Sequence, residues 1–153
     1  MVGPVFFLDV NALLALFWPT HEHHAKIQSW FRADKRRWAT CPITQAGFVR
    51  LASNPLITRD AVSVSEAIKL LGANLEHPGH VFWTDDLEIQ AALSQFGGHI
   101  QGYRQVTDAY LLALAIRHKA QLVTFDSGIA ALSPPGLRGS TQVIDLAGRI
   151  PRN

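Results

Sequence analysis

The sequence contains one cysteine and no long apolar segment, and these two absences exclude several classes of protein. Cys41 has no second cysteine with which to form an internal disulfide, and it lies among apolar residues, so we expect a buried thiol in a reducing compartment. No apolar run approaches the roughly 18 residues of a membrane-spanning helix. The N-terminal residues also lack the basic start and cleavage site of a signal peptide. We therefore expect a soluble, cytoplasmic protein.

Charged residues are also scarce, at 17%, whereas 48% of the residues are hydrophobic. A chain of 153 residues with this balance can bury the core of one compact domain, and the composition argues against disorder. The net charge of +2 and pI of about 9.0 only weakly favour an anionic partner. Because no repeat and no linker rich in Pro, Gly or Ser divides the sequence, we expect residues 1–153 to form a single domain.

Strand-like and helix-like patterns alternate along the chain. Short apolar runs predict strands over 5–8, 38–41, 81–83, 121–124 and 143–146. Helices are predicted over 11–18, 23–33, 44–52, 63–75, 86–95 and 108–119, and residues 96–102 predict a loop. The expected N-caps are Asn11, Thr44, Ser63 or Ser65, Asp86 and Thr107. Strands that alternate with helices favour an α/β fold with a mainly parallel sheet of about five strands.

Three aspartates occupy the positions where a parallel α/β sheet places its ligand sites. Asp9 ends the first predicted strand, Asp126 follows the fourth, and Asp108 begins the most apolar predicted helix. Because such ligand sites lie at the carboxyl ends of the strands, we expect the three side chains to meet. Clustered carboxylates repel one another unless a cation binds, and oxygen ligands favour Mg²⁺ or Mn²⁺. The pattern therefore predicts a metal site suited to phosphodiester chemistry.

Each aspartate also has a purely structural interpretation. Asp9 fits a helix cap, Asp108 fits a charge that complements a helix dipole, and Asp126 fits a turn with Ser127 and Gly128. Only their joint placement favours the metal site.

Four segments in this order resemble known nucleases. Residues 7–14 (FLDVNALL), 107–115 (TDAYLLALA) and 123–126 (VTFD) are similar to the three signature segments of PIN-domain nucleases, and residues 40–50 (TCPITQAGFVR) resemble the branch called VapC toxins. The resemblance spans nearly the whole chain. It implies a three-layer α/β/α sandwich and a cytoplasmic, Mg²⁺- or Mn²⁺-dependent endoribonuclease, the toxin of a type II toxin–antitoxin system. It also implies a homodimer and a small VapB-type antitoxin that occupies the active-site groove.

The resemblance assigns roles to individual residues. Asp9, Asp108 and Asp126 match the acidic positions of the family and are the implied metal ligands and catalytic residues, and Thr124 matches a hydroxyl that supports the site. Asn11, two residues after Asp9, is a further supporting candidate.

Arg104, beside the glycine-containing loop, is a candidate contact for a phosphate or for an antitoxin carboxylate. The departure from the family is Gln45, which stands where this branch usually has glutamate and offers only a neutral carbonyl oxygen. Two interpretations stay open: a nuclease whose metal site Gln45 weakens, as a natural residue or as an inactivating substitution, or an inactive PIN module that binds RNA or an antitoxin. A phosphatase or DNA nuclease on a similar sheet is a third alternative.

Other clusters have simpler explanations. The basic residues Arg32, Lys35, Arg36 and Arg37 fit either contacts with RNA phosphates or a solvated face. Residues 21–24 (HEHH) lack the spacing of a zinc helix and favour a solvated helix start. The aromatic residues at 17, 18, 30 and 31 fit helix packing or a dimer or antitoxin surface. Asp85, after the third strand, is a candidate for indirect support of the site.

Overall fold

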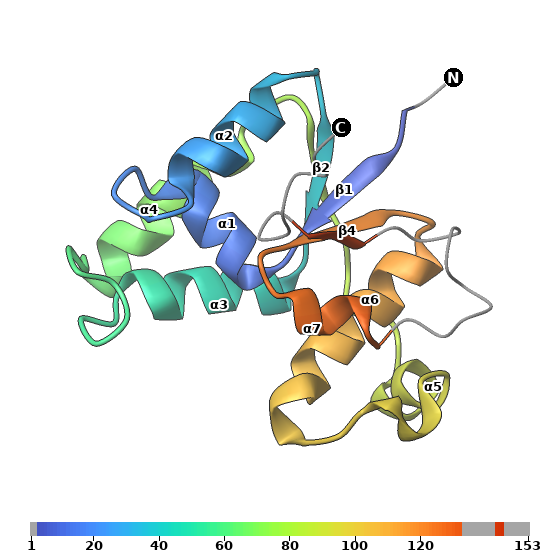
Figure 1. The fold of residues 1–153 in the computed structure, drawn as a ribbon. Helices are drawn as coiled ribbons and strands as arrows, with labels where there is room; N and C mark the ends of the chain where they lie inside the picture. Colours follow the sequence, from blue (N-terminus) through green and yellow to red (C-terminus); the bar gives the residue numbers. More distant parts are fainter. Residues whose placement is uncertain (1–2, 133–142, 146–153) are drawn as a thin grey trace, which may run out of the picture.

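The computed structural model describes residues 3–132 and 143–145 (Figure 1). Its sheet contains strands β1 (Val5–Leu8), β2 (Arg37–Thr40), β3 (His80–Phe82), β4 (Gln121–Thr124) and β5 (Val143–Asp145). The strand order is β3-β2-β1-β4-β5, and all neighbouring pairs are parallel. The predicted α/β class and parallel sheet are confirmed. Because β1 lies at the centre, the residue that follows it is flanked by strand ends on both sides.

The helices form two layers around this sheet. They are α1 (Val10–Phe17), α2 (His24–Arg32), α3 (Pro42–Ala52), α4 (Val64–Leu75), α5 (Ile89–Ser94), α6 (Val106–Arg117) and α7 (Ser127–Ala130), with 3₁₀ turns at Gly97–His99 and Tyr103–Gln105. Figure 1 shows α1–α4 on one side of the strands and α5–α7 on the other, which is the predicted three-layer α/β/α sandwich. In the part of the chain that the structure describes, no helix is long and apolar enough to cross a membrane.

Alternating strand residues supply a separate core on each face of the sheet, as the period-two geometry of a strand requires. Phe6 and Leu8 pack among the residues of α1–α4, whereas Phe7 packs among those of α6. The four aromatic residues that the sequence left between core and surface belong to the first of these cores: Phe17 and Trp18 are buried, and Trp30 and Phe31 pack against it. All four therefore take part in helix packing, and Trp30 and Phe31 also stay partly exposed.

Several predicted helix starts are wrong by one or two residues, and the contacts explain why. Asp9, not Asn11, caps α1, because its carboxylate accepts from the Ala12 backbone N–H at 2.7 Å. Helix α3 begins at Pro42, and the Thr44 hydroxyl accepts from the Cys41 backbone N–H at 3.0 Å, so Thr44 lies inside the first turn. The predicted Ser63 cap of α4 is confirmed by its 3.1 Å bond from the Glu66 backbone N–H.

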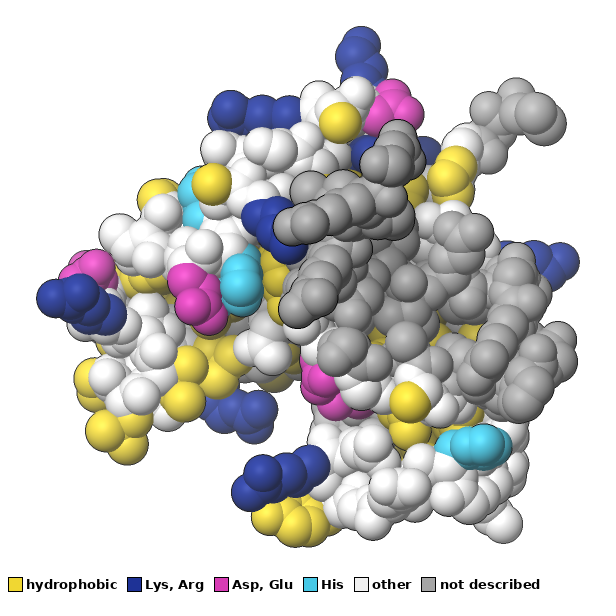
Figure 2. Space-filling model, in the orientation of Figure 1, with side chains coloured by type: hydrophobic (Ala, Val, Ile, Leu, Met, Phe, Trp, Pro, Cys, Tyr) yellow, Lys and Arg dark blue, Asp and Glu magenta, His cyan; other side chains and the backbone are white. Residues whose placement is uncertain are grey.

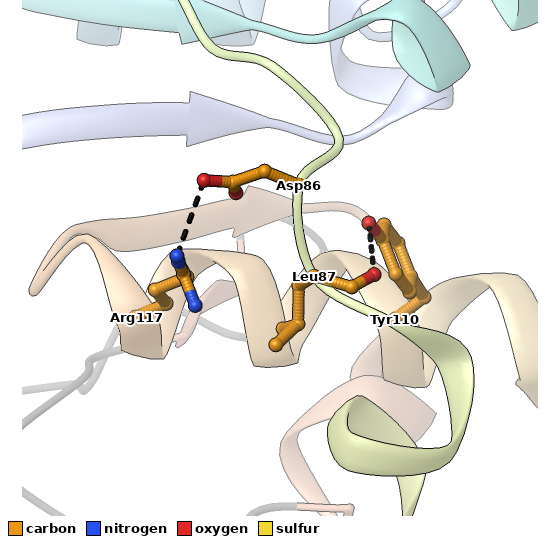
Figure 3. A network of polar contacts seen from close by, with 4 residues as sticks. All are labelled: Asp86, Leu87, Tyr110 and Arg117. Atoms are coloured by element: carbon orange, nitrogen blue, oxygen red, sulfur yellow. Dashed lines mark hydrogen bonds and ion pairs between the residues drawn. The ribbon is translucent and has the colours of Figure 1, made fainter.

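The segment between β3 and α5 departs most from the prediction. Asp86 does not cap a helix: α5 begins at Ile89, and the Asp86 carboxylate pairs with Arg117 at 3.1 Å (Figure 3). The Tyr110 hydroxyl donates to the Leu87 carbonyl at 2.9 Å. Both contacts hold this segment against α6, so residues 86–88 do not form the first turn of α5.

Helix α6 is buried almost all round, as its composition predicts. Residues 109–115 are all buried, in the middle of the core on its side of the sheet. The helix begins at Val106 after a 3₁₀ turn, and its N-cap position is Gln105, so the predicted Thr107 cap is wrong. The earlier start places Asp108 in the first turn, where its charge complements the helix dipole.

Helices α1 and α3 approach each other closely beside Asp9. A Cβ atom on Gly47 of α3 would lie 2.6 and 2.8 Å from the two methyl carbons of Val10, the first residue of α1. Valine is stiff at χ1, so neither methyl group can move away cheaply. The absence of a side chain at Gly47 therefore allows α3 to pack closely against the start of α1.

We predict that Gly47→Ala lowers stability by about 1–3 kcal/mol through overpacking against Val10. Thermal unfolding followed by circular dichroism measures the change. The matched control is Gly72→Ala on α4, where a Cβ would meet nothing within 4 Å; that change should be stabilising by roughly 0.5–1 kcal/mol, since alanine is the better helix former. Equal melting temperatures for the two variants would contradict the proposed role of Gly47.

Candidate metal centre

Asp9 lies at the junction of the two central strands. Its backbone N–H continues the sheet by donating to the Val123 carbonyl of β4 at 3.1 Å. The residue is only 4% exposed, and its carboxylate accepts from the Ala12 backbone N–H and from the Thr124 hydroxyl. The carboxylate is therefore fixed by α1 on one side and by β4 on the other.

Thr124 links Asp9 to Asp126. Its buried hydroxyl donates to Asp9 and accepts from the Asp126 backbone N–H at 2.9 Å. The exposed Asp126 side chain in turn caps α7 by accepting from the Gly128 backbone N–H at 2.9 Å. The structural turn that the sequence allowed for Asp126 is present, and it leaves Asp126 beside the strand end that carries Thr124.

The charges of the three aspartates act against one another. Burial raises the pKa of the Asp9 carboxyl to about 6, against the lowering effect of its bonds from Thr124 and Ala12, and the charges of Asp108 and Asp126 raise it further. Burial and the charge of Asp126 likewise raise the pKa of the half-buried Asp108 to about 6. A cation at this point would reverse both repulsions.

The chemistry of the donors suits a hard cation. Carboxylate oxygens are available, whereas burial raises the pKa of the Cys41 thiol to about 11, so no thiolate competes. The present arrangement is not closed around one point: in residues 3–132 and 143–145, no three His, Cys, Asp or Glu side chains are placed to hold an ion together. One oxygen of Asp9 and one of Asp126 also accept the helix-cap bonds, and each carboxylate keeps further lone pairs for a cation.

Gln45 lies in the first half of α3, the helix that follows β2, and β2 is the neighbour of the strand that ends before Asp9. Its amide donates to the Thr40 hydroxyl at 3.0 Å, and that hydroxyl also lies 2.8 Å from His80 Nε2. Thr40 ends β2, which pairs with β1, so Gln45 lies at the same edge of the sheet as Asp9. In this structure its amide is directed toward Thr40.

The other predicted supporting residues differ in position. The exposed Asn11 lines a pocket together with Asp126. Arg104 lies in the 3₁₀ turn before α6, with its guanidinium 5.8 Å from the centre of the Tyr103 ring. Asp85 lies near Cys41, and its Oδ1 atom is buried without a hydrogen-bond partner among the described residues.

The basic cluster is far from the aspartates along the strands. Arg37 begins β2 and pairs with Val5, at the amino ends of strands whose carboxyl ends carry Asp9 and Asp126. Arg36 packs its guanidinium on the Phe6 and Trp30 rings and donates to the Trp30 carbonyl at 2.8 Å. Part of the cluster is therefore structural.

Figure 2 shows acidic side chains at the inner edge of a hollow between the layer of α1–α4 and the layer of α5–α7.

Sequence reasoning missed the histidine segment at 21–24. His23 stacks on Phe125 with ring centres 4.4 Å apart, and His21, Glu22 and His23 line the same pocket as Asn11 and Asp126. Their spacing carried no metal signature, and the contact with Phe125 joins residues about a hundred positions apart. Only a three-dimensional structure places this segment beside Asp126.

The raised pKa of Asp108 predicts a pH-dependent stability. Its pKa is about 6 in the folded chain against an ordinary 3.8, so its contribution to stability is fully present below about pH 4 and lost as the pH rises through 6. In the absence of metal, Asp108→Asn should therefore melt above the wild type at pH 7.5 and close to it at pH 4. Differential scanning calorimetry tests this prediction. Asp34→Asn, at an exposed position, is the control, and its melting temperature should match that of the wild type at both pH values. A lower melting temperature for Asp108→Asn at pH 7.5 would refute the electrostatic account.

The PIN domain family matches residues 6–133. Ribonuclease VapC38 of Mycobacterium tuberculosis (strain ATCC 25618 / H37Rv) is 47% identical over 127 residues, which are 82% of this chain and 88% of the relative. Ribonuclease VapC39 of Mycobacterium tuberculosis (strain CDC 1551 / Oshkosh) is 42% identical over 131 residues, 85% of this chain and 94% of the relative.

A solved structure supports the fold independently. FitAcB from Neisseria gonorrhoeae aligns with a TM-score of 0.61 at 16% identity, over 93% of this chain and 98% of that chain. The shared fold, the aspartates at the carboxyl ends of the strands and the identity to relatives over most of their length agree: this chain belongs to the PIN-domain family and, within it, to the VapC ribonucleases.

Proposed function

We propose that this chain is a Mg²⁺- or Mn²⁺-dependent endoribonuclease and the toxin of a type II toxin–antitoxin system that acts on cytoplasmic RNA. The observation that carries the proposal is that the buried Thr124 hydroxyl bonds both the Asp9 carboxylate and the Asp126 backbone at the carboxyl ends of the central strands. The charge of Asp108, in the first turn of α6, acts on the same carboxylate. The relatives named as VapC ribonucleases support the choice of RNA as substrate.

In this proposal, Asp9, Asp108 and Asp126 hold the metal. The bound cation would lower the pKa of a water molecule and offset the charge that develops on the phosphodiester. Thr124 orients Asp9 by donating to its Oδ2 atom, so that this carboxylate is held in place. Gln45 keeps a neutral side chain at the same edge of the sheet, which leaves the site with three acidic groups.

Protein partners are also part of the proposal. A VapB-like antitoxin that covers the site and a homodimeric assembly are the partners expected of this family. Exposed apolar side chains on and before α4 offer area for protein contacts, including Leu56, Ile57, Val64 and Ile68.

We predict that purified protein cleaves RNA with Mg²⁺ or Mn²⁺ and stops when EDTA is added. Asp9→Asn should lower the rate by about 100-fold or more, because loss of a ligand should exceed the roughly 10- to 100-fold effect of losing an outer partner. Asp34→Asn, an exposed aspartate before β2, is the matched control and should cleave normally. Cleavage that persists in EDTA, or that Asp9→Asn leaves unchanged, would overturn the proposed metal chemistry.

The rival function is RNA or antitoxin binding without cleavage, and the bond from the Gln45 amide to Thr40 is the observation that favours it. If the nuclease proposal holds, Gln45→Glu adds a fourth carboxylate at this edge and should tighten Mn²⁺ binding on the order of 10-fold, with faster cleavage. Calorimetric titration and RNA cleavage assays measure both effects.

The control for this charge change is Gln90→Glu, which adds the same charge on the exposed surface of α5. Equal Mn²⁺ affinity and cleavage for Gln45→Glu and wild type would show that residue 45 does not face the metal. Tight RNA binding without cleavage by either protein would favour the rival.

A further inference from the structure

A pocket of about 440 Å³ adjoins the proposed metal centre. It is lined by Asn11, His21, Glu22, His23, Phe125 and Asp126. One wall is the segment between α1 and α2, and the other is the segment between β4 and α7. Since Asp126 belongs to both the pocket and the carboxylate group, a molecule in the pocket lies next to the metal-binding edge.

His23 is held firmly in this wall while remaining accessible. Its ring stacks on Phe125 with an interplanar angle of 13°, and Phe125 packs against the core beneath it. The His23 backbone N–H donates to His21 Nδ1 at 3.0 Å. His23 nevertheless leaves 37% of its side chain exposed.

The helix that follows is anchored as well. His24 Nδ1 lies 2.8 Å from the Ala15 carbonyl of α1, so the start of α2 is tied to the helix that Asp9 caps. The histidine segment is thus preorganised relative to Asp9. It is the start of α2 that the sequence suggested, but its histidines are partly buried and not fully solvated. A fixed, exposed ring beside a reaction centre suits the positioning of a substrate.

We propose that this pocket holds the RNA nucleotide next to the scissile phosphodiester and that His23 is a positioning residue that contacts it. The proposal rests on the ribonuclease function proposed above. Single-stranded RNA is recognised by stacking on aromatic or histidine rings and by donors to its phosphates. The His23 ring and the Asn11 amide offer both kinds of contact at the pocket surface.

Glu22 provides a second test, in which the expected change in RNA binding is opposite to that for His23. Its carboxylate lies 3.4 Å from His23 Nε2, and its side chain is 81% exposed, so it is free to swing away when a phosphate approaches. Its negative charge opposes an RNA phosphate in the same pocket. Neutralising Glu22 should therefore strengthen RNA binding, whereas removing the His23 ring should weaken it.

We predict that His23→Ala raises the KM for a short single-stranded RNA on the order of 10-fold and changes kcat much less, because stacking and phosphate contacts act mainly in binding. Glu22→Gln should lower KM. Mn²⁺ affinity, measured by calorimetry, should be the same in both variants and the wild type. His23→Phe, which keeps the stack on Phe125 but not the ring nitrogens, should recover part of the loss.

The matched control is His118→Ala. His118 also stacks on an aromatic ring, Trp83, at 3.9 Å and 7°, but it follows α6 at the opposite end from Asp108. If His118→Ala raises KM as much as His23→Ala does, the effect is general destabilisation and the proposal fails. Loss of Mn²⁺ affinity in His23→Ala, or weaker binding of an antitoxin without any change for RNA, overturns it as well.

Fluorescence anisotropy with a labelled single-stranded RNA separates this inference from the proposed function. If the wild type cleaves RNA and His23→Ala is indistinguishable from it, the pocket inference is wrong and the nuclease stands. If no protein cleaves but His23→Ala still weakens RNA binding, the nuclease proposal is wrong, and the pocket stands only as an RNA-binding site without a scissile bond.

Discussion

The hydrogen bond from the Thr124 hydroxyl to the Asp9 carboxylate joins residues 115 positions apart at the centre of the sheet. The same hydroxyl accepts from the Asp126 backbone, and the same carboxylate caps α1. Two strands, one helix and the loop before α7 are thus oriented by a few polar atoms. The strand order places them in the middle of the sheet, where the neighbouring strand ends and helix α6 surround them.

This arrangement is electrostatically unfavourable when it stands alone. Asp9 is buried and its ionised form faces two further negative charges, so the folded chain holds the proton more tightly than an unfolded chain does. A purely structural helix cap needs no such repulsion, since serine or threonine caps a helix without charge. The requirements of the fold do not explain this repulsion, and a cation bound as proposed above would offset it.

The sequence predicted the long-range features better than the local ones. The parallel sheet and the buried α6 follow from hydrophobic periodicity, and the places of Asp9 after β1 and Asp126 after β4 follow from where the predicted strands end. Helix caps at Asn11, Thr44, Asp86 and Thr107 were wrong, because a cap is decided by the geometry of a single turn.

The histidine pocket was not predictable from spacing, because its decisive contact is with Phe125 on another part of the chain. Asp86 was misassigned for a similar reason, since its partner Arg117 lies on α6. In both cases a tertiary contact overrides what the neighbouring residues suggest.

The central position of β1 has a consequence for synthesis on the ribosome. Its neighbour β4 is complete only when residue 124 has been synthesised, and Asp126 comes after it. During most of its synthesis the growing chain therefore contains Asp9 but not Thr124 or Asp126. Contacts of such high sequence separation also form late in folding. A destructive activity built this way is withheld from incomplete chains and arises only when nearly the whole domain has been assembled.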